Sequence, residues 1–167
     1  MRRSLYLLLC FFGIGACLDP VTHDEQNALG GEIEGIEPGP RHRSGQPCLT
    51  CHGDERTQTP VMMAAGTVFR KKGSNDRAEG AVITISDAKG KVRKKTANDR
   101  GNFYVTVDEW PDPVYPLESR IDFTDSDGAW IATMVTRIGR NADCNRCHQG
   151  DGDPSHAQRT YADEVRP

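Results

Sequence analysis

The chain has 167 residues, of which 36% are hydrophobic and 7% aromatic, and its mean hydropathy is −0.63. This length and polarity allow one modest domain and exclude an enzyme with a large core. The formal net charge is −3, which disfavours nucleic acid as a partner because binding it requires positive charge to displace counterions. The six cysteines could serve disulfides, metal sites or covalent cofactor attachment.

Residues 1–16 have the pattern of an export signal. Arg2 and Arg3 precede an apolar run at 5–14, which is shorter than the roughly 20 residues that a membrane-spanning helix needs. Small residues then lead to Cys17. Cleavage there would discard Cys10 and both arginines, lowering Lys plus Arg from 21 to 19 against 24 acidic residues. The net charge of the remaining chain would be about −5.

The residues around this cleavage point, Ile14-Gly15-Ala16-Cys17, resemble the bacterial lipobox. The resemblance implies that Cys17 is acylated and becomes the new N-terminus, so that lipid holds the protein to a membrane. Because Leu18 rather than aspartate follows the cysteine, it also implies an outer-membrane lipoprotein of a Gram-negative bacterium, on the periplasmic face or the cell surface. The alternative is ordinary cleavage after Ala16, which would leave a free thiol.

Residues 17–46 are acidic, rich in glycine and proline, and nearly free of large apolar side chains. Such a composition cannot bury enough apolar surface to offset the entropy of ordering the chain. We therefore expect a disordered tether over 17–46, with a reach of roughly 30 Å.

Residues 65–137 alternate between short apolar segments and turns. Strands are expected at 67–69, 81–86, 92–96, 103–107, 121–124 and 130–136, and turns at 87–90 and 98–101. Alternation with period two and a turn every eight to twelve residues predicts a mainly β fold, a small antiparallel β-sandwich. This stretch has no comparable apolar stripe with period 3.6, so short helical or irregular segments are expected only on its flanks, at 47–64 and 138–167.

Four elements of this region resemble the transthyretin-like or carboxypeptidase-regulatory-like sandwich domains. They are Gly66-Thr67-Val68, Gly80-Ala81-Val82, the Asp-x-x-Gly run at 87–90, and Gly101-Asn102-Phe103. The resemblance implies an Ig/transthyretin-like sandwich. It says little about function, because such sandwiches are general scaffolds.

Two complete C-x-x-C-H runs flank the predicted sandwich. They are Cys48-Leu49-Thr50-Cys51-His52 and Cys144-Asn145-Arg146-Cys147-His148, and this spacing is the attachment signal of c-type haem. Two thiols three positions apart on a helical turn reach the two vinyl groups of one porphyrin edge, and the next histidine ligates the iron. The sequence thus predicts two haems, with thioethers at Cys48, Cys51, Cys144 and Cys147 and proximal iron ligands at His52 and His148.

Three other roles are possible for these cysteines. A Cys₄ zinc site would leave both histidines unexplained. Disulfide oxidoreductases carry C-x-x-C, with a lowered thiol pKa, at a strand-to-helix turn of an α/β fold. Structural disulfides are possible in an exported protein, but a separation of three residues makes small strained rings.

The second axial ligand of each iron is less constrained by the sequence. Candidates by residue type are Met62, Met63, Met134, His156, His23 and His42. Met134 shares a predicted strand face with Trp130, so core packing is an alternative role, and the methionine pair could merely begin the sandwich. His156 lies in a Gly/Asp/Pro-rich loop from which it could reach either iron. The remaining two histidines fall in the expected tether, where a solvated side chain is the default.

The arrangement of motifs over residues 47–160 resembles small exported dihaem cytochromes in which haem motifs bracket a β domain. This resemblance implies one-electron transfer with redox partner proteins such as other cytochromes or membrane electron-transfer complexes. One alternative is a small haem oxidoreductase or peroxidase with one open iron site. Another is a β-sandwich binding module in which the haems are structural. The oligomeric state is left open by the sequence.

Overall fold

The computed structural model describes residues 20–32, 34–54, 58–150 and 159–162. The predicted export signal, Cys17 and His156 lie outside these residues. The chain divides into two units, Met1–Gly30 and Gly31–Pro167. Within the first unit, helix α1 (Pro20–Ala28) carries a hydrogen bond of 3.0 Å between Asn27 Nδ2 and His23 Nδ1. Across the described ranges, no helix is long and apolar enough to cross a membrane.

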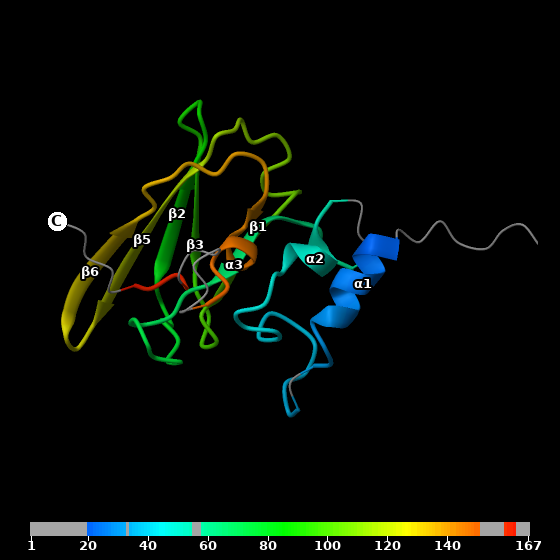
Figure 1. Cartoon of the computed structure of the whole chain (residues 1–167). Helices are drawn as coiled ribbons and strands as arrows, with labels where there is room; N and C mark the ends of the chain where they lie inside the picture. The colour runs from blue at the N-terminus through cyan, green and yellow to red at the C-terminus, as the bar shows by residue number, and fades with distance from the viewer. Residues whose placement is uncertain (1–19, 33, 55–57, 151–158, 163–167) are drawn as a thin grey trace, which may run out of the picture. The chain divides into compact units, whose positions relative to one another are not determined.

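The second unit is mainly β (Figure 1). Among the described residues, one sheet has the strand order β4-β1-β7 and the other the order β3-β2-β5-β6. The strands are β1 (Met62–Thr67), β2 (Val82–Ser86), β3 (Val92–Thr96), β4 (Asn102–Thr106), β5 (Glu118–Asp125), β6 (Gly128–Thr133) and β7 (Ala142–Asp143). Two single-turn helices, α2 (Leu49–His52) and α3 (Cys144–Cys147), complete the unit.

The two sheets share one hydrophobic core. Ile83 and Ile85 of β2 are each 1% exposed, and Phe103 and Val105 of β4 are 4% and 0% exposed. All four belong to the same buried cluster, to which one sheet contributes β2 and the other β4. The pairs β1–β4, β2–β3, β2–β5 and β5–β6 are antiparallel. The prediction of a mainly β, largely antiparallel fold with few helices is therefore confirmed.

The turn between β2 and β3 is organised by one buried carboxylate. Asp87 Oδ1 accepts hydrogen bonds from the backbone N–H of Lys89 and of Lys91, both at 2.9 Å, and Oδ2 accepts one from Val114 at 3.2 Å. Burial opposes ionisation of this side chain, but the backbone donors outweigh burial and the pKa of Asp87 lies below its usual range. The predicted turn at 87–90 thus closes the β2–β3 hairpin and also fastens the segment around Val114.

Strand β1 differs from its sequence-based description. It begins at Met62 rather than Thr67, and all six of its residues are buried. It lies between β4 and β7, and both α2 and α3 pack on it, so its two faces are covered and its sequence shows no alternation. It pairs in parallel with β7, Ala64 with Ala142 and Ala65 with Asp143, and of these residues only Ala65 lies in the segment expected to form the sandwich.

Part of the segment expected to be a disordered tether, 17–46, has defined contacts in the structure. Besides α1, the residues just before the first C-x-x-C-H run are held to the sheets by hydrogen bonds. Asn98 Nδ2 donates to the carbonyl of Pro40 at 2.7 Å, Asn102 Nδ2 to that of His42 at 3.0 Å, and Gly45 N–H to Thr67 Oγ1 at 2.8 Å. Polar side chains of the sandwich order this segment, which needs no apolar residues of its own to be fixed.

Candidate functional site

Both C-x-x-C-H runs fold into the same local structure, a single helical turn. In the first, the backbone N–H of His52 donates to the carbonyl of Cys48 at 3.0 Å; in the second, that of His148 donates to Cys144 at 2.9 Å. Each turn brings the two cysteines of its motif, three positions apart, to one side of the helix with the histidine next along the chain. The two motifs are thus structural duplicates as well as sequence duplicates.

The two turns are joined to each other. In Figure 1, α2 and α3 both lie beside β1, on which they pack. The backbone N–H of Leu49 in α2 donates to Asp143 Oδ2 at 2.9 Å, and Asn145 Nδ2 in α3 donates to the carbonyl of Gln46 at 2.8 Å. The same amide nitrogen lies 4.0 Å from Cys48 Sγ. The fold therefore brings together two motifs that the sequence places far apart.

Asn145, one of the two variable positions inside the second motif, is the centre of this junction. Its side chain is 2% exposed. Its Oδ1 accepts a hydrogen bond from the backbone N–H of Thr67 at 3.0 Å, and its Nδ2 also donates to Thr67 Oγ1 at 3.1 Å. Asn145 thus ties α3 to the end of β1 and to the chain that enters α2.

Strand β1 permits this close approach because it carries glycine at position 66. A Cβ atom placed on Gly66 would lie 2.7 Å from the Cβ of Cys144 and 3.0 Å from Cε1 of Phe103. Contacts this short do not occur between carbon atoms at rest. The absence of a side chain at Gly66 therefore makes the room in which the first cysteine of α3 lies.

The first thiol of each motif is neutral. Burial raises the pKa of Cys48 to about 12, and the neighbouring charge of Asp143 adds to this effect. The same two causes raise the pKa of Cys144 to about 12. Reactive C-x-x-C cysteines of disulfide oxidoreductases show the opposite shift, a lowered thiol pKa. The environment of these two thiols does not match that chemistry.

Asp143 is the buried acid of the site, with 2% of its surface exposed. Burial raises its pKa to about 6, an increase that the backbone N–H groups of Leu49, Arg146 and Cys48 reduce. Asp143 Oδ2 accepts the hydrogen bond from Leu49, whereas no hydrogen-bond partner is found for Oδ1 among the described residues. The Asp143 side chain therefore joins the start of α3 to the first turn of α2.

His52 is buried, with 8% of its surface exposed, and its ring orientation is fixed. Its Nδ1 lies 3.0 Å from the carbonyl oxygen of Pro60, an acceptor that places the ring proton on Nδ1. Burial lowers the pKa of His52, and nearby His42 lowers it further, although the bond to Pro60 acts in the opposite direction. A neutral imidazole with Nδ1–H on a carbonyl presents Nε2 for metal binding, the arrangement typical of metal-ligating histidines.

The second motif is more open than the first. Cys147 and Arg146 are exposed, and His148 is partly buried. Gln149 Nε2 donates to the carbonyl of Arg146 at 2.8 Å and so closes the turn from its far end.

The candidate second ligands differ in their surroundings. Met62 and Met63 are buried in β1, at 9% and 8% exposure, so the pair does begin a strand of the sandwich. Met134 follows β6 and packs against the hydrophobic core, as does Trp130. His42, for which the sequence predicts a solvated side chain, lies beside His52, and the centroids of the two rings are 5.7 Å apart. The sequence offers His42 as a candidate by residue type alone, because its segment has the composition of a tether.

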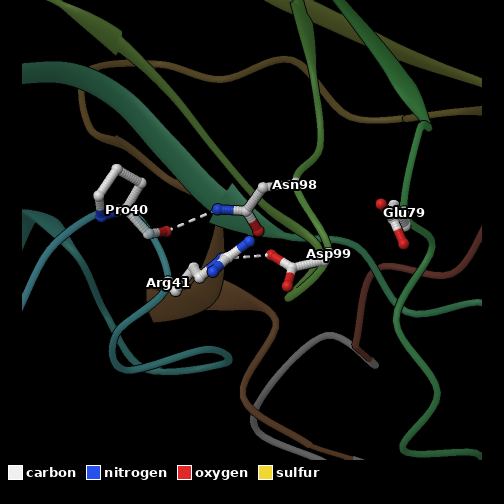
Figure 2. A pocket seen from close by; sticks show the side chains of 5 residues that line it. All are labelled: Pro40, Arg41, Glu79, Asn98 and Asp99. Atoms are coloured by element: carbon white, nitrogen blue, oxygen red, sulfur yellow. Dashed lines mark hydrogen bonds and ion pairs between the residues drawn. The ribbon is translucent and has the colours of Figure 1, made fainter. Parts of the chain in front are cut away.

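A polar recess lies beside the segment that carries His42. It has a volume of about 500 Å³ and is lined by Pro40, Arg41, Glu79, Asn98 and Asp99 (Figure 2). Arg41 Nε donates to Asp99 Oδ1 at 2.8 Å across it. The recess lies where this segment contacts the turn between β3 and β4.

Within the described part of the chain, no three His, Cys, Asp or Glu side chains are grouped so as to hold a metal ion. Cys48, Cys51, Cys144 and Cys147 form no disulfide there. The chain matches no family model. It likewise matches no curated protein and no solved structure.

Proposed function

We propose that this protein is an exported, lipid-anchored dihaem c-type cytochrome that transfers single electrons between partner proteins. The observation that carries the proposal is that both C-x-x-C-H runs form the same helical turn and that Asp143 and Asn145 fasten these turns together. One such motif could arise by chance. Two motifs that have the same residue pattern, form the same local structure and pack on the same strand are difficult to explain by another chemistry.

The residues fit a c-type haem in three respects. Cys48 with Cys51, and Cys144 with Cys147, supply the thiol pairs, each thiol adding its S and H across one vinyl double bond of the porphyrin. His52 supplies a neutral imidazole whose Nδ1 is held by Pro60. The thiol of Cys48 is kept protonated by burial, so it is protected from accidental oxidation until attachment.

Bound haem supplies an iron that gains or loses one electron. One electron arrives from a reduced donor protein and one leaves to an oxidised acceptor protein, so the chain itself is unchanged after each cycle. The part of the chain is to hold two such centres in fixed positions. The hydrogen bonds of Asp143 and Asn145 between the turns keep the two attachment points adjacent, which favours transfer from one centre to the other.

The sandwich is the scaffold for this arrangement, and we assign it to the Ig/transthyretin-like class. Three of the motif elements that suggested the class lie at the end of β1, at the start of β2 and at the start of β4, and the Asp-x-x-Gly run closes the β2–β3 hairpin. Lipid on Cys17 would place the scaffold at the outer membrane, on the periplasmic face or the cell surface. Other cytochromes or membrane electron-transfer complexes are then the expected partners.

Haem stoichiometry tests the proposal directly. The full chain, produced together with a cytochrome c maturation system, is expected to contain two haems per chain by the pyridine haemochrome assay. Replacing both cysteines of one motif, Cys48 with Cys51 or Cys144 with Cys147, by serine should leave one haem per chain in either variant. Protein that carries no haem and instead contains zinc would overturn the proposal in favour of a Cys₄ zinc site.

A further inference from the structure

His42 and His52 form a close pair of imidazole rings. Their centroids are 5.7 Å apart and the ring planes are inclined by 30°. Two imidazoles bound to opposite sides of one metal ion, each through a bond of about 2 Å, have ring centres about 6 Å apart. The observed separation therefore suits two rings that share a metal ion between them.

Hydrogen bonds and an ion pair fix the position of the backbone at His42. Asn102 Nδ2 donates to the backbone carbonyl of His42 at 3.0 Å, and the preceding residue, Arg41, forms an ion pair of 2.8 Å with Asp99. Figure 2 shows this ion pair together with the hydrogen bond from Asn98 to Pro40. Asn98 and Asp99 belong to the turn between β3 and β4, and Asn102 is the first residue of β4. The turn thus holds the His42 ring near that of His52.

In both rings Nδ1 is the nitrogen engaged by the protein backbone. His52 Nδ1 faces the carbonyl of Pro60 at 3.0 Å, and His42 Nδ1 accepts a hydrogen bond from Gly39 N–H at 3.2 Å. Nε2 is then the nitrogen of each ring directed away from its backbone partner. Coordination through Nε2 of His42 would put the ring proton on Nδ1, so the bond from Gly39 would be released when metal binds.

The methionine candidates lack this relationship. Met63 and Met134 pack with the hydrophobic core of the sandwich, and Met62 is a buried residue of β1. Withdrawing any of them to reach an iron would leave a cavity among buried side chains, which destabilises the fold. His42 needs no such withdrawal, because its ring is partly buried and already lies beside His52.

We propose that His42 is the second axial ligand of the haem attached at Cys48 and Cys51, opposite His52. This inference rests on the proposed function. Its Nε2 lone pair completes the coordination of the iron, which gives the first motif a six-coordinate, bis-histidine centre. Such ligation lowers the reduction potential relative to a histidine–methionine pair, and it closes the iron to small molecules.

The test compares His42→Ala with His23→Ala, a histidine in the other structural unit. Each full chain carrying its haems is assayed for haem content and for carbon monoxide bound per chain after reduction. We expect His42→Ala to bind one carbon monoxide more per chain than the unmodified protein, and free imidazole to suppress that binding. His23→Ala should match the unmodified protein.

A second variant, His42→Met, supports the inference even where the alanine variant assembles poorly. It should remain six-coordinate, while the reduction potential of one haem rises. Two haems per chain in His42→Ala without added carbon monoxide binding would overturn the ligand assignment and leave the dihaem proposal intact. An unchanged potential in His42→Met would do the same. Absence of haem from the unmodified chain would overturn both.

Discussion

The carboxylate of Asp143 accepts a hydrogen bond from the backbone N–H of Leu49 at 2.9 Å, although the two residues are 94 positions apart. Leu49 is the first residue of α2 and Asp143 directly precedes α3. The bond satisfies an N–H that a helix start leaves without an intrahelical partner, and it does so from the opposite motif. One side chain therefore makes the geometry of each attachment turn depend on the other.

Replacing Asp143 by alanine should destabilise the protein. The variant leaves the N–H of Leu49 without its acceptor, which costs about 1–3 kcal/mol in a buried setting. The free energy of unfolding in urea measures this loss. Glu118→Ala is the matched control, because it removes an exposed carboxylate paired with Arg137, and surface pairs contribute about 0–1 kcal/mol. Equal losses in the two variants would show that Asp143 does not join the turns.

A methyl group at position 66 should disturb the second motif. Because the added Cβ of Gly66→Ala would meet Cys144 at 2.7 Å and Phe103 at 3.0 Å, α3 or the Phe103 ring must move, at a cost of about 1–3 kcal/mol. Gly139→Ala is the control, since a Cβ there meets nothing within 4 Å. We expect the Gly66 variant alone to unfold at lower urea and to carry less than two haems per chain. Full haem content with unchanged stability would argue against close packing of α3 on β1.

The sequence predicted those strands whose two faces have different surroundings. In β2 the buried residues Ile83 and Ile85 alternate with partly exposed ones, and in β4 Phe103 and Val105 do so. The strand predicted at 67–69 shares only Thr67 with β1, because all residues of β1 are buried and no alternation marks its start at Met62. A strand covered on both faces has lost the period-two signal on which such predictions depend.

Some features of the candidate site follow from short sequence patterns, whereas others depend on contacts between distant parts of the chain. The C-x-x-C-H spacing is local, and the two helical turns could be anticipated from it. The hydrogen bond between Asp143 and Leu49 joins residues 94 positions apart, and no local sequence pattern predicts it. The sequence indicates His42 as a candidate by residue type alone, because hydrogen bonds from Asn102 and Asn98 order its segment, and such bonds leave no hydrophobic pattern in the sequence.

The contribution of Asp87 to stability should depend on pH. Its pKa is lowered in the folded state, because backbone donors outweigh burial, so the ionised carboxylate stabilises the fold above pH of about 4 and loses this effect as pH falls through the folded pKa. The free energy of unfolding of Asp87→Asn should therefore differ most from that of the unmodified chain at pH 7, and less at pH 3. Asp108→Asn, at an exposed position, serves as control. A difference that is constant between the two pH values would contradict this role.

The predicted lipid anchor can be tested independently of the haems. Cys17→Ser removes the thiol that the lipobox resemblance marks for acylation, and acyl chains contribute about 0.8 kcal/mol of membrane affinity for each buried CH₂ group. The variant should move from the membrane fraction to the soluble fraction of the cell envelope. Cys10→Ser is the matched control, because that cysteine lies in the apolar run that cleavage would discard, and it should stay with the membrane. Haem content depends on residues 48–52 and 144–148 and should therefore be the same in both variants. Retention of Cys17→Ser on membranes would instead indicate attachment through a partner protein.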